Sequence, residues 1–462
     1  MLQSRNYSRP FHNKWYNNPT EYTIWGFIMS ENDFDKILND VKKRANARLD
    51  IDPPVKSPSQ QGYRDLLNCE NSNSVEIHTS RAESNKSKKK NNKNIITAII
   101  VVIIIAIAAA GAYFALSNSK SDGTSTANQS ANIAENKAVN PLTGESGFNQ
   151  AAVGRQPVAV VAENEYSTPA VRPQWGLNDA DIVIEGESEY STRLLLLWAD
   201  YTSVPDMVGP VRSARPPFIK FSQLFDSVFI HAGLSKSKGS YVGADSIFKT
   251  ENVDHINLLE LSEDGKYFGR NNERNTSMEH TGYLNGSNLP ELLKEKGIDT
   301  ALNNSSFSAL NFSDKPAALS DTQAEGCSFT WSEVCPKTAE FIYSSSSHKY
   351  ETKDFDSQYG KANAEFENLI FLFDQTQYIV KEDYKNGASE TYCDYKLAGG
   401  SGMVLSEGTA IEITWGVTDG KLWLRTSDGK DISLNQGKSY IGYGSENNGG
   451  SLKLNFTEKN GN

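Results

Sequence analysis

Residues 180–198 read ADIVIEGESEYSTRLLLLW and contain two apolar runs on either side of a polar turn. Each run is short and rich in Ile, Val or Leu, which is typical of a strand that is buried on both faces. We predict a hairpin of two buried strands here, with Glu185, Glu187 and Arg193 close to its turn. Charged side chains would then gather at one end of an otherwise apolar layer.

The sequence on both sides of this hairpin mixes strand and helix patterns. Residues 157–162 and 228–231 are further apolar runs of strand length, whereas 213–224 and 289–296 carry apolar residues at helical spacing. Strands that alternate with helices predict a layered α/β domain, which we place at residues 140–298.

Strand patterns dominate the C-terminal part of the chain. Apolar and polar residues alternate near 411–415 and 422–425, and Asp-Gly pairs that favour tight turns separate such runs. We predict a mostly antiparallel β domain over 339–462, joined to the first domain by a Ser- and Asn-rich connector at 299–338. The expected fold class is therefore α+β.

The composition excludes some classes of function. The 462-residue chain has a formal net charge of -11 and a pI near 5.2, whereas nucleic-acid-binding domains are usually basic. We therefore expect no nucleic acid partner. The charge is unevenly divided, because the net charge of residues 1–94 is +5 and that of residues 95–462 is -16.

A membrane-spanning segment is predicted between these two parts. Residues 95–116 read IITAIIVVIIIAIAAAGAYFAL and contain no charged residue. About 20 apolar residues suffice to cross the hydrocarbon core as a helix. Five lysines lie between 86 and 93, and only Lys120 follows closely, so the positive-inside rule predicts a cytoplasmic N-terminus and extracytoplasmic C-terminal domains. We expect a single-pass protein of the cell membrane.

Two further segments are expected to position this anchor. The basic tail, residues 1–94, is predicted to be mostly disordered, with one amphipathic helix near 31–49 that rests near the lipid or binds a partner. Translation starts either at Met1 or at Met29. Residues 117–139 are polar and small, and they predict a flexible tether.

Three cysteines lie in the predicted outer region. An oxidising exterior favours a disulfide between Cys327 and Cys335, which leaves Cys393 unpaired. In the alternative, which fits an anaerobic cell, all three thiols are reduced.

One stretch concentrates groups that suit an anion. Residues 209–216, GPVRSARP, place Arg212, Ser213 and Arg215 between a turn and the predicted start of a helix. Guanidinium groups bind carboxylate or phosphate in a bidentate manner, and helix N-termini also favour anions. With Arg193 and Ser235, these residues form our candidate ligand-binding set. The alternative is an internal network of salt bridges between Arg and Glu or Asp.

Candidate acid–base residues lie around the same stretch. The histidines are His231 and His280, and the carboxylates that could act with them are Asp226, Glu185 and Glu187. No pair of outer histidines has metal-ligand spacing, and no complete phosphate loop or catalytic motif is present. We therefore expect neither a metal nor a cofactor.

Several motifs resemble one family. NPLTG at 140–144, GPVRSAR at 209–215, HAGLS at 231–235 and DGKDISLNQGK at 428–438 resemble, in wording and order, the YerB-like lipoproteins of Gram-positive bacteria. This family is defined as a domain of unknown function, DUF3048, with N-terminal and C-terminal domains. The resemblance spans about 140–445 and implies an extracytoplasmic location and a two-domain layout, but no reaction.

The chain departs from the family in two ways. A predicted transmembrane helix stands where the family has a lipid anchor. Glu279, His280 and Thr281 stand where family members tend to have Pro-His-Asn, so the resemblance carries over His280 but not its neighbours.

These observations support three hypotheses of function. The first is a non-enzymatic envelope protein that binds an anionic or cell-wall-linked ligand, such as a wall polymer or an envelope protein. The second is an envelope hydrolase that uses a His and carboxylate pair. The third is a scaffold whose tail links a cytoplasmic partner to the wall. No residue pattern indicates an oligomeric state.

Overall fold

A computed structural model describes residues 5–6, 138–302, 310–335, 337–385 and 387–455. Within these ranges no helix is both long and apolar enough to cross a membrane. The predicted span at 95–116, the tail helix near 31–49, both candidate starts and nearly all of the tether lie outside the described residues. These features therefore stay predictions.

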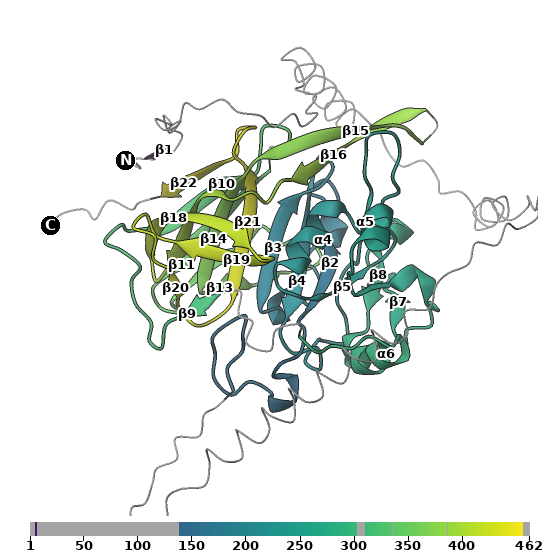
Figure 1. Ribbon diagram of the computed structural model, residues 1–462, viewed down its shortest axis with the longest axis horizontal. Helices are drawn as coiled ribbons and strands as arrows, with labels where there is room; N and C mark the ends of the chain where they lie inside the picture. Colours follow the sequence, from purple (N-terminus) through teal and green to yellow (C-terminus); the bar gives the residue numbers. More distant parts are fainter. Residues whose placement is uncertain (1–4, 7–137, 303–309, 336, 386, 456–462) are drawn as a thin grey trace, which may run out of the picture. The chain divides into compact units, whose positions relative to one another are not determined.

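The described part of the chain is organised around a ten-stranded mixed sheet (Figure 1). The described residues belong to one compact unit. In spatial order the sheet contains β19 (Lys421–Arg425), β18 (Thr409–Thr418), β17 (Gly400–Ser406), β14 (Asn368–Asp374), β21 (Ser439–Ser445), β3 (Ile182–Glu187), β4 (Thr192–Trp198), β2 (Val158–Glu163), β5 (Val228–His231) and β6 (His255–Asn257).

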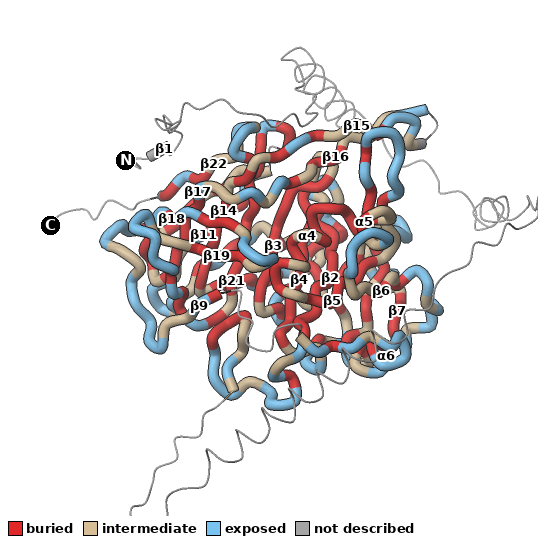
Figure 2. The backbone as a smooth tube through the Cα atoms, in the orientation of Figure 1, coloured by how far each residue is buried: buried red, intermediate tan, exposed pale blue. Residues whose placement is uncertain are grey.

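The predicted hairpin lies in the middle of this sheet. Strands β3 and β4 pair antiparallel, with Gly186 opposite Arg193, and all their residues are buried (Figure 2). Two apolar clusters cover the two faces of the strands, which explains their continuous Ile, Val and Leu runs. The expected strands at 157–162 and 228–231 are confirmed as β2 and β5.

Strand β21 joins the N-terminal segment (138–302) to the C-terminal segment (310–455). It pairs parallel with β14 on one side and with β3 on the other. The C-terminal segment is mostly antiparallel, as expected, and its parallel pairs are β14 with β21 and β9 (Asn311–Phe312) with β20 (Ser433–Leu434). Because β3 and β21 share a ladder, the two segments predicted as separate domains contribute to one continuous sheet.

A second sheet covers part of the first. Its strands, in order, are β1 (Arg5–Asn6), β22 (Ser451–Asn455), β10 (Gly326–Thr330), β11 (Thr338–Ser344), β12 (Lys349–Thr352) and β13 (Ala364–Phe366). Aromatic rings fill the layer between the sheets. Phe329 stacks on Phe371 at 4.6 Å, and Phe341 contacts Tyr440 at 4.8 Å, measured between ring centroids. The predicted connector therefore contains a core strand, β10, because Cys327 and Phe329 alternate inward.

Three α-helices and six short 3-10 helices pack around the N-terminal segment. The α-helices are α4 (Pro216–Gln223), α5 (Ala244–Thr250) and α6 (Leu289–Glu295), so the helices predicted at 213–224 and 289–296 are confirmed with shorter bounds. The 3-10 helices are η1 (Gln150–Ala152), η2 (Pro169–Val171), η3 (Leu177–Asp179), η4 (Leu258–Glu260), η5 (Met278–His280) and η6 (Gly286–Asn288).

Helix α4 lies on one face of the central hairpin. Two prolines open it, which suits the first turn of a helix because no backbone donor is lost there. Its Phe221 ring stacks on Tyr443 of β21 at 4.3 Å. The other face is covered by α6 together with the small hairpin of β7 (Phe268–Arg270) and β8 (Gly282–Leu284).

A long hairpin reaches from the C-terminal segment toward α4 and α5 (Figure 1). It is formed by β15 (Thr376–Lys385) and β16 (Ala388–Tyr395). The Lys220 ammonium of α4 binds the Asp394 carboxylate at 2.8 Å, and Tyr241 stacks on Tyr392 at 4.2 Å. A last small pair joins β9 (Asn311–Phe312) to β20 (Ser433–Leu434).

The predicted disulfide is not formed. Cys327, Cys335 and Cys393 are all free, fully buried thiols. Cys327 faces the apolar layer between the sheets from the start of β10, whereas Cys335 follows the end of that strand. Burial raises the pKa of each thiol well above its usual range, so these groups stay protonated at neutral pH.

We expect these three thiols to be unreactive until the protein unfolds, because thiolates are the reactive form and reagent access is blocked. A Cys69→Ser variant of the full chain, treated with a chromogenic disulfide reagent, should react at no site in native buffer. In denaturant it should react at three. Fast labelling of the native variant, or a linked Cys327–Cys335 peptide in non-reducing mass spectrometry, would contradict the structure.

Candidate functional site

Polar and charged residues gather where parallel strands of the large sheet end. Strands β2, β3, β5 and β21 all run in one direction, because β2 and β3 are both antiparallel to β4 and the others pair parallel with them. Ligands of open α/β sheets bind outside the carboxyl ends of the strands. We call this region the carboxyl edge. It receives Glu163, Glu187, His231 and the N-terminus of α4, which follows Arg215.

Arg212 forms an ion pair with a buried carboxylate at this edge. Its Nε lies 2.5 Å from Oε2 of Glu163, and Nδ1 of His280 lies 3.1 Å from the same oxygen. Burial alone would raise the pKa of Glu163, but Arg212 and His280 outweigh it and lower this pKa to about 2. The Glu163 carboxylate is therefore charged and fixes both partners.

The far side of the Arg212 guanidinium faces Glu279. Nη1 donates to the Glu279 carbonyl at 3.1 Å and lies 3.4 Å from its carboxylate. The Arg212 side chain is 19% exposed and that of Glu279 is 63% exposed. Nε2 of His280 lies 3.6 Å from the same Glu279 carboxylate. One edge of the Arg212 guanidinium thus contacts a buried carboxylate, and the other is covered by a solvent-exposed acid.

Arg193 and Arg215 share a second carboxylate, Glu189. Nε of Arg215 lies 2.5 Å from one oxygen, and Nη2 of Arg193 lies 3.2 Å from the other. Burial opposes ionisation of Glu189, but Arg193 and Arg215 together lower its pKa to about 2. Both guanidinium groups are nearly inaccessible. The salt-bridge alternative therefore describes these two arginines, and Arg212 differs from them.

The two predicted serines also serve internal contacts. Oγ of Ser213 donates to the Ala232 carbonyl at 2.9 Å. Oγ of Ser235 accepts from the Tyr241 hydroxyl at 2.8 Å and from the Ala244 amide at 3.1 Å. These bonds fix the loops that flank α4 and α5.

His231 and Asp226 do not form a catalytic pair. They lie at opposite ends of β5, since Asp226 precedes the strand and His231 ends it. His231 is fully buried, with its ring nitrogens bonded to the Gly233 carbonyl at 2.6 Å and to His255 at 3.1 Å. Burial lowers the pKa of His231 to about 4, so the ring is neutral at pH 7.

Glu185 is a structural residue rather than an open acid. It is fully buried and accepts hydrogen bonds from Lys337 at 2.5 Å, from Tyr440 at 2.9 Å and from Asn164 at 2.8 Å. Lys337 and Tyr440 belong to the C-terminal segment. Glu185 therefore ties this segment to the central hairpin.

Glu187 lies on the same strand as Glu185 and is also buried, but its carboxyl group stays protonated. Its Oε2 accepts from Ser332 at 2.7 Å and from Tyr378 at 3.0 Å. Burial raises the pKa of Glu187 to about 8, and these two hydrogen bonds only partly oppose the shift. Its other oxygen, Oε1, has no hydrogen-bond partner among the described residues.

The residues that we did not predict are Glu163, Glu189 and Lys337. Glu163 directly follows the predicted strand 157–162, where a buried run meets polar sequence, and this position was an available signal. Glu189 lies four residues before Arg193 in the turn. Lys337 could not have been found, because no local sequence pattern shows that β21 pairs with β3 and so brings the two segments together.

Comparisons with known proteins agree with this layout. Residues 142–299 match the model described as Protein of unknown function (DUF3048) N-terminal domain, and residues 330–441 match the corresponding C-terminal domain. A protein of Bacillus subtilis (strain 168), named "Putative lipoprotein YerB", is 31% identical over 308 residues, which cover 65% of this chain and 84% of that protein. The chain belongs to the YerB-like family. The resemblance in the sequence motifs is thereby confirmed.

The YerB-like fold is also seen in a solved structure. The crystal structure of the YerB protein from Bacillus subtilis matches with a TM-score of 0.53 and 25% identity, over 68% of this chain and 99% of the other. The geometry shows what Glu279 contacts. Glu279 is the acid that covers the exposed side of Arg212.

We expect Glu187 to make the stability of the protein fall as pH rises. Its pKa is higher in the folded protein than in the unfolded chain, so its stabilising contribution is complete below about pH 4.5 and is lost as pH rises through 8. Between pH 5 and pH 8 the unfolding free energy of the native protein should fall by on the order of 3 kcal/mol more than that of a Glu187→Gln variant.

Chemical denaturation of both proteins across this range measures the difference. Other titrating groups, including His231, are common to both proteins and cancel. A Glu340→Gln variant, at an exposed position of β11, is the matched control and should follow the native curve. Parallel curves for Glu187→Gln and the native protein would show that Glu187 is ionised when folded.

Proposed function

We propose that this YerB-like protein is a non-enzymatic binding protein, anchored in the cell membrane, that holds an anionic or cell-wall-linked ligand at the carboxyl edge. Arg212 is the central residue of the proposal. The observation that carries it is the two-sided environment of Arg212, with buried Glu163 at 2.5 Å on one side and exposed Glu279 at 3.4 Å on the other.

The charges around Arg212 support binding of an anion. The buried network contains three arginines, Arg193, Arg212 and Arg215, but only two buried glutamates, Glu163 and Glu189. One positive charge is left over, and of the three guanidinium groups Arg212 is the most exposed. A ligand carboxylate or phosphate would replace the Glu279 side chain on Nη1, where charge-assisted hydrogen bonds are strong.

Other observations support a location on the outer face of the cell membrane. The relative is named as a lipoprotein, and this chain has the predicted span at 95–116 with lysines on its N-terminal side. We propose that this helix takes the place of a lipid anchor. The short β1 at Arg5–Asn6 pairs with β22. A spanning helix would place residues 5–6 and β22 on opposite sides of the membrane, so the proposed anchor requires that this pairing is absent from the membrane-anchored protein.

A hydrolase remains the second candidate because of one contact. Nδ1 of His280 lies 3.1 Å from Glu163, an arrangement that orients an imidazole, and Nε2 points toward exposed Glu279. His280 is one of the two candidate histidines of the sequence analysis, whereas its partner Glu163 is not among the candidate carboxylates; the other histidine, His231, is enclosed. Release of product from wall peptides or glycans by the purified protein would favour this candidate.

We expect a Glu279→Gln variant to bind anionic ligands more tightly than the native protein, because it removes the acid that competes for Arg212. Binding of glycerol-phosphate oligomers and of muropeptides to the full chain in detergent, measured by calorimetry, should strengthen by about two- to fivefold. The gain should disappear at high salt.

The matched control is Glu291→Gln, which removes an exposed acid paired with Lys266 away from the carboxyl edge. This control should bind as the native protein does. Equal effects of the two variants would indicate a general change in net charge, and no binding by any variant would end the proposal.

We expect the native protein to resist extraction from membranes by alkaline carbonate and to be released by detergent. Two lysines in the middle of the predicted span, Ile103→Lys with Ile104→Lys, should shift most of the protein to the soluble fraction. Each charge costs about 2.5–3.5 kcal/mol at the centre of a helix. Ser119→Lys, in the predicted tether, should stay with the membrane. Carbonate release of the native protein would contradict the anchor.

A further inference from the structure

The imidazole of His280 faces the same exposed acid as the guanidinium of Arg212. Oε2 of Glu279 lies 3.4 Å from Nη1 of Arg212, and Oε1 of Glu279 lies 3.6 Å from Nε2 of His280. The two oxygens of one carboxylate are thus divided between a guanidinium and an imidazole. The Glu279 carboxylate marks the position of an oxyanion that carries two oxygens on one carbon or phosphorus atom.

The other ring nitrogen of His280 determines what Nε2 can do. Nδ1 lies 3.1 Å from Oε2 of Glu163, whose carboxylate is charged. A carboxylate only accepts hydrogen bonds, so the hydrogen of the neutral ring is on Nδ1. Nε2 then carries a lone pair and has no hydrogen to donate. Its separation of 3.6 Å from Glu279 is longer than a hydrogen bond, as expected for two acceptors.

The charges around the ring come from three further elements besides its own. Glu279 lies on η5 with His280, Glu163 ends β2, and Arg212 from the segment before α4 shares an oxygen of Glu163 with the ring. Arg193 of β4 also acts on Glu163 and helps to lower its pKa. An anion that approaches Nε2 adds negative charge beside a ring that is 7% exposed, where water screens it poorly. Its arrival therefore favours a proton on Nε2.

We propose that His280 is the second contact for an anion at Arg212, and that Nε2 takes up a proton from solvent when the anion binds. The ligand is the anion of the proposed function, so this inference rests on that proposal. In the bound state Nη1 of Arg212 and protonated Nε2 of His280 each donate to one ligand oxygen. Carboxylates and phosphodiesters have the required pair of oxygens, and charge-assisted hydrogen bonds to such groups are strong.

Uptake of a proton sets the direction of the pH dependence. An anion that binds the protonated ring better is bound more tightly as pH falls, and the bound anion in turn favours the protonated ring. One full proton corresponds to a change of about tenfold in the dissociation constant per pH unit. Imidazoles titrate between roughly pH 5 and pH 8. We expect binding at least about threefold tighter at pH 6 than at pH 8.

Calorimetry on the native full-length chain in detergent measures the uptake directly. The probe is a glycerol-phosphate oligomer, because its phosphodiesters do not titrate in this range. In two buffers with different ionisation enthalpies, the observed heats differ in proportion to the number of protons taken up. We expect uptake of about 0.3 to 1 proton per oligomer bound at pH 7.

A pair of histidine variants identifies the group that takes up the proton. His280→Gln places an amide donor near the position of Nε2 but cannot titrate, so binding should persist while its pH dependence and proton uptake disappear. His348→Asn removes an exposed histidine that pairs with Glu407 and has a left-handed φ of 59°, which Asn tolerates. This control should keep the native pH dependence. Thermal unfolding verifies both folds, and the native measurement needs neither variant.

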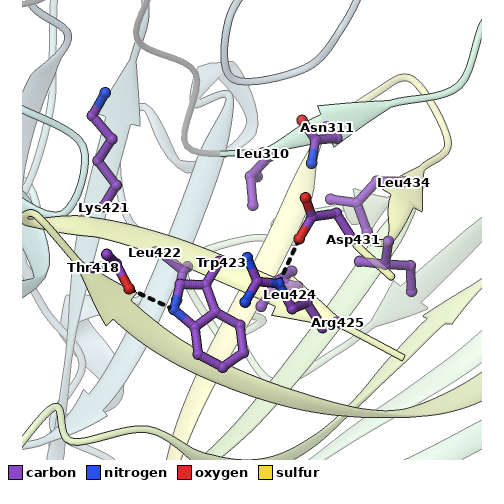
Figure 3. Close-up of a pocket in the computed structure, with 11 residues that line it drawn as sticks. Leu310, Asn311, Thr418, Lys421, Leu422, Trp423, Leu424, Arg425, Asp431 and Leu434 are labelled. Carbon is purple, nitrogen blue, oxygen red and sulfur yellow. Dashed lines mark hydrogen bonds and ion pairs between the residues drawn. The ribbon is translucent and has the colours of Figure 1, made fainter. Parts of the chain in front are cut away.

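A second arginine provides a control without an imidazole. In the hollow beside β19, Nε of Arg425 binds Oδ1 of Asp431 at 2.7 Å (Figure 3), and none of the residues that line this hollow is a histidine. Asp431→Asn therefore frees a guanidinium much as Glu279→Gln does. We expect Glu279→Gln to take up more protons per bound oligomer than the native protein, because its free ring no longer faces an acid. Asp431→Asn should show the native uptake.

The outcomes separate this inference from the proposed function. Binding that is independent of pH and takes up no proton would overturn the role of His280 and leave the anion site at Arg212 standing. Unchanged pH dependence in His280→Gln would assign the proton to another group and overturn that role as well. Absence of anion binding at every pH would end both proposals together.

Discussion

Two carboxylic acids on the central strand β3, Glu185 and Glu187, are bound by side chains of the C-terminal segment. Glu185 and Glu187 are both fully buried, and a buried acid without partners is costly. Lys337 and Tyr440 bind the first, while Ser332 and Tyr378 bind the second. The parallel ladder between β21 and β3 brings these groups into place. The described segments thus behave as one folded body around a shared polar core.

The arginine motif illustrates how one sequence pattern serves two purposes. Arg193 and Arg215 neutralise Glu189 inside the protein, and their position fixes the start of α4. Arg212 uses Glu163 in the same way but keeps a solvent-facing side. The internal pairs hold the geometry of the edge, since removing one partner of a buried ion pair is strongly destabilising. The exposed side of Arg212 is not part of these buried ion pairs, so it can serve a different function.

Much of the local structure could be predicted from sequence. The central hairpin, β2, β5 and helix α4 follow from apolar runs, periodicity and the paired prolines of α4. Long-range pairing could not be predicted. Nothing in the local sequence states that β21 lies against β3, so the single sheet and the burial of Glu185 and Glu187 were missed. The disulfide expectation failed for the same reason, because sequence proximity does not show that β10 places Cys327 in a core layer.

The shared sheet has a consequence for biogenesis. Strand β3 begins at residue 182, but its parallel neighbour β21 begins at residue 439. Contacts between such distant residues form slowly, because a long loop must close first. Until the last part of the chain has been synthesised, Glu185 and Glu187 lack most of their partners and one side of the central hairpin is an open strand edge. Such an edge is prone to mispairing. The folding chain therefore keeps an exposed strand edge that can mispair until its C-terminal segment is complete.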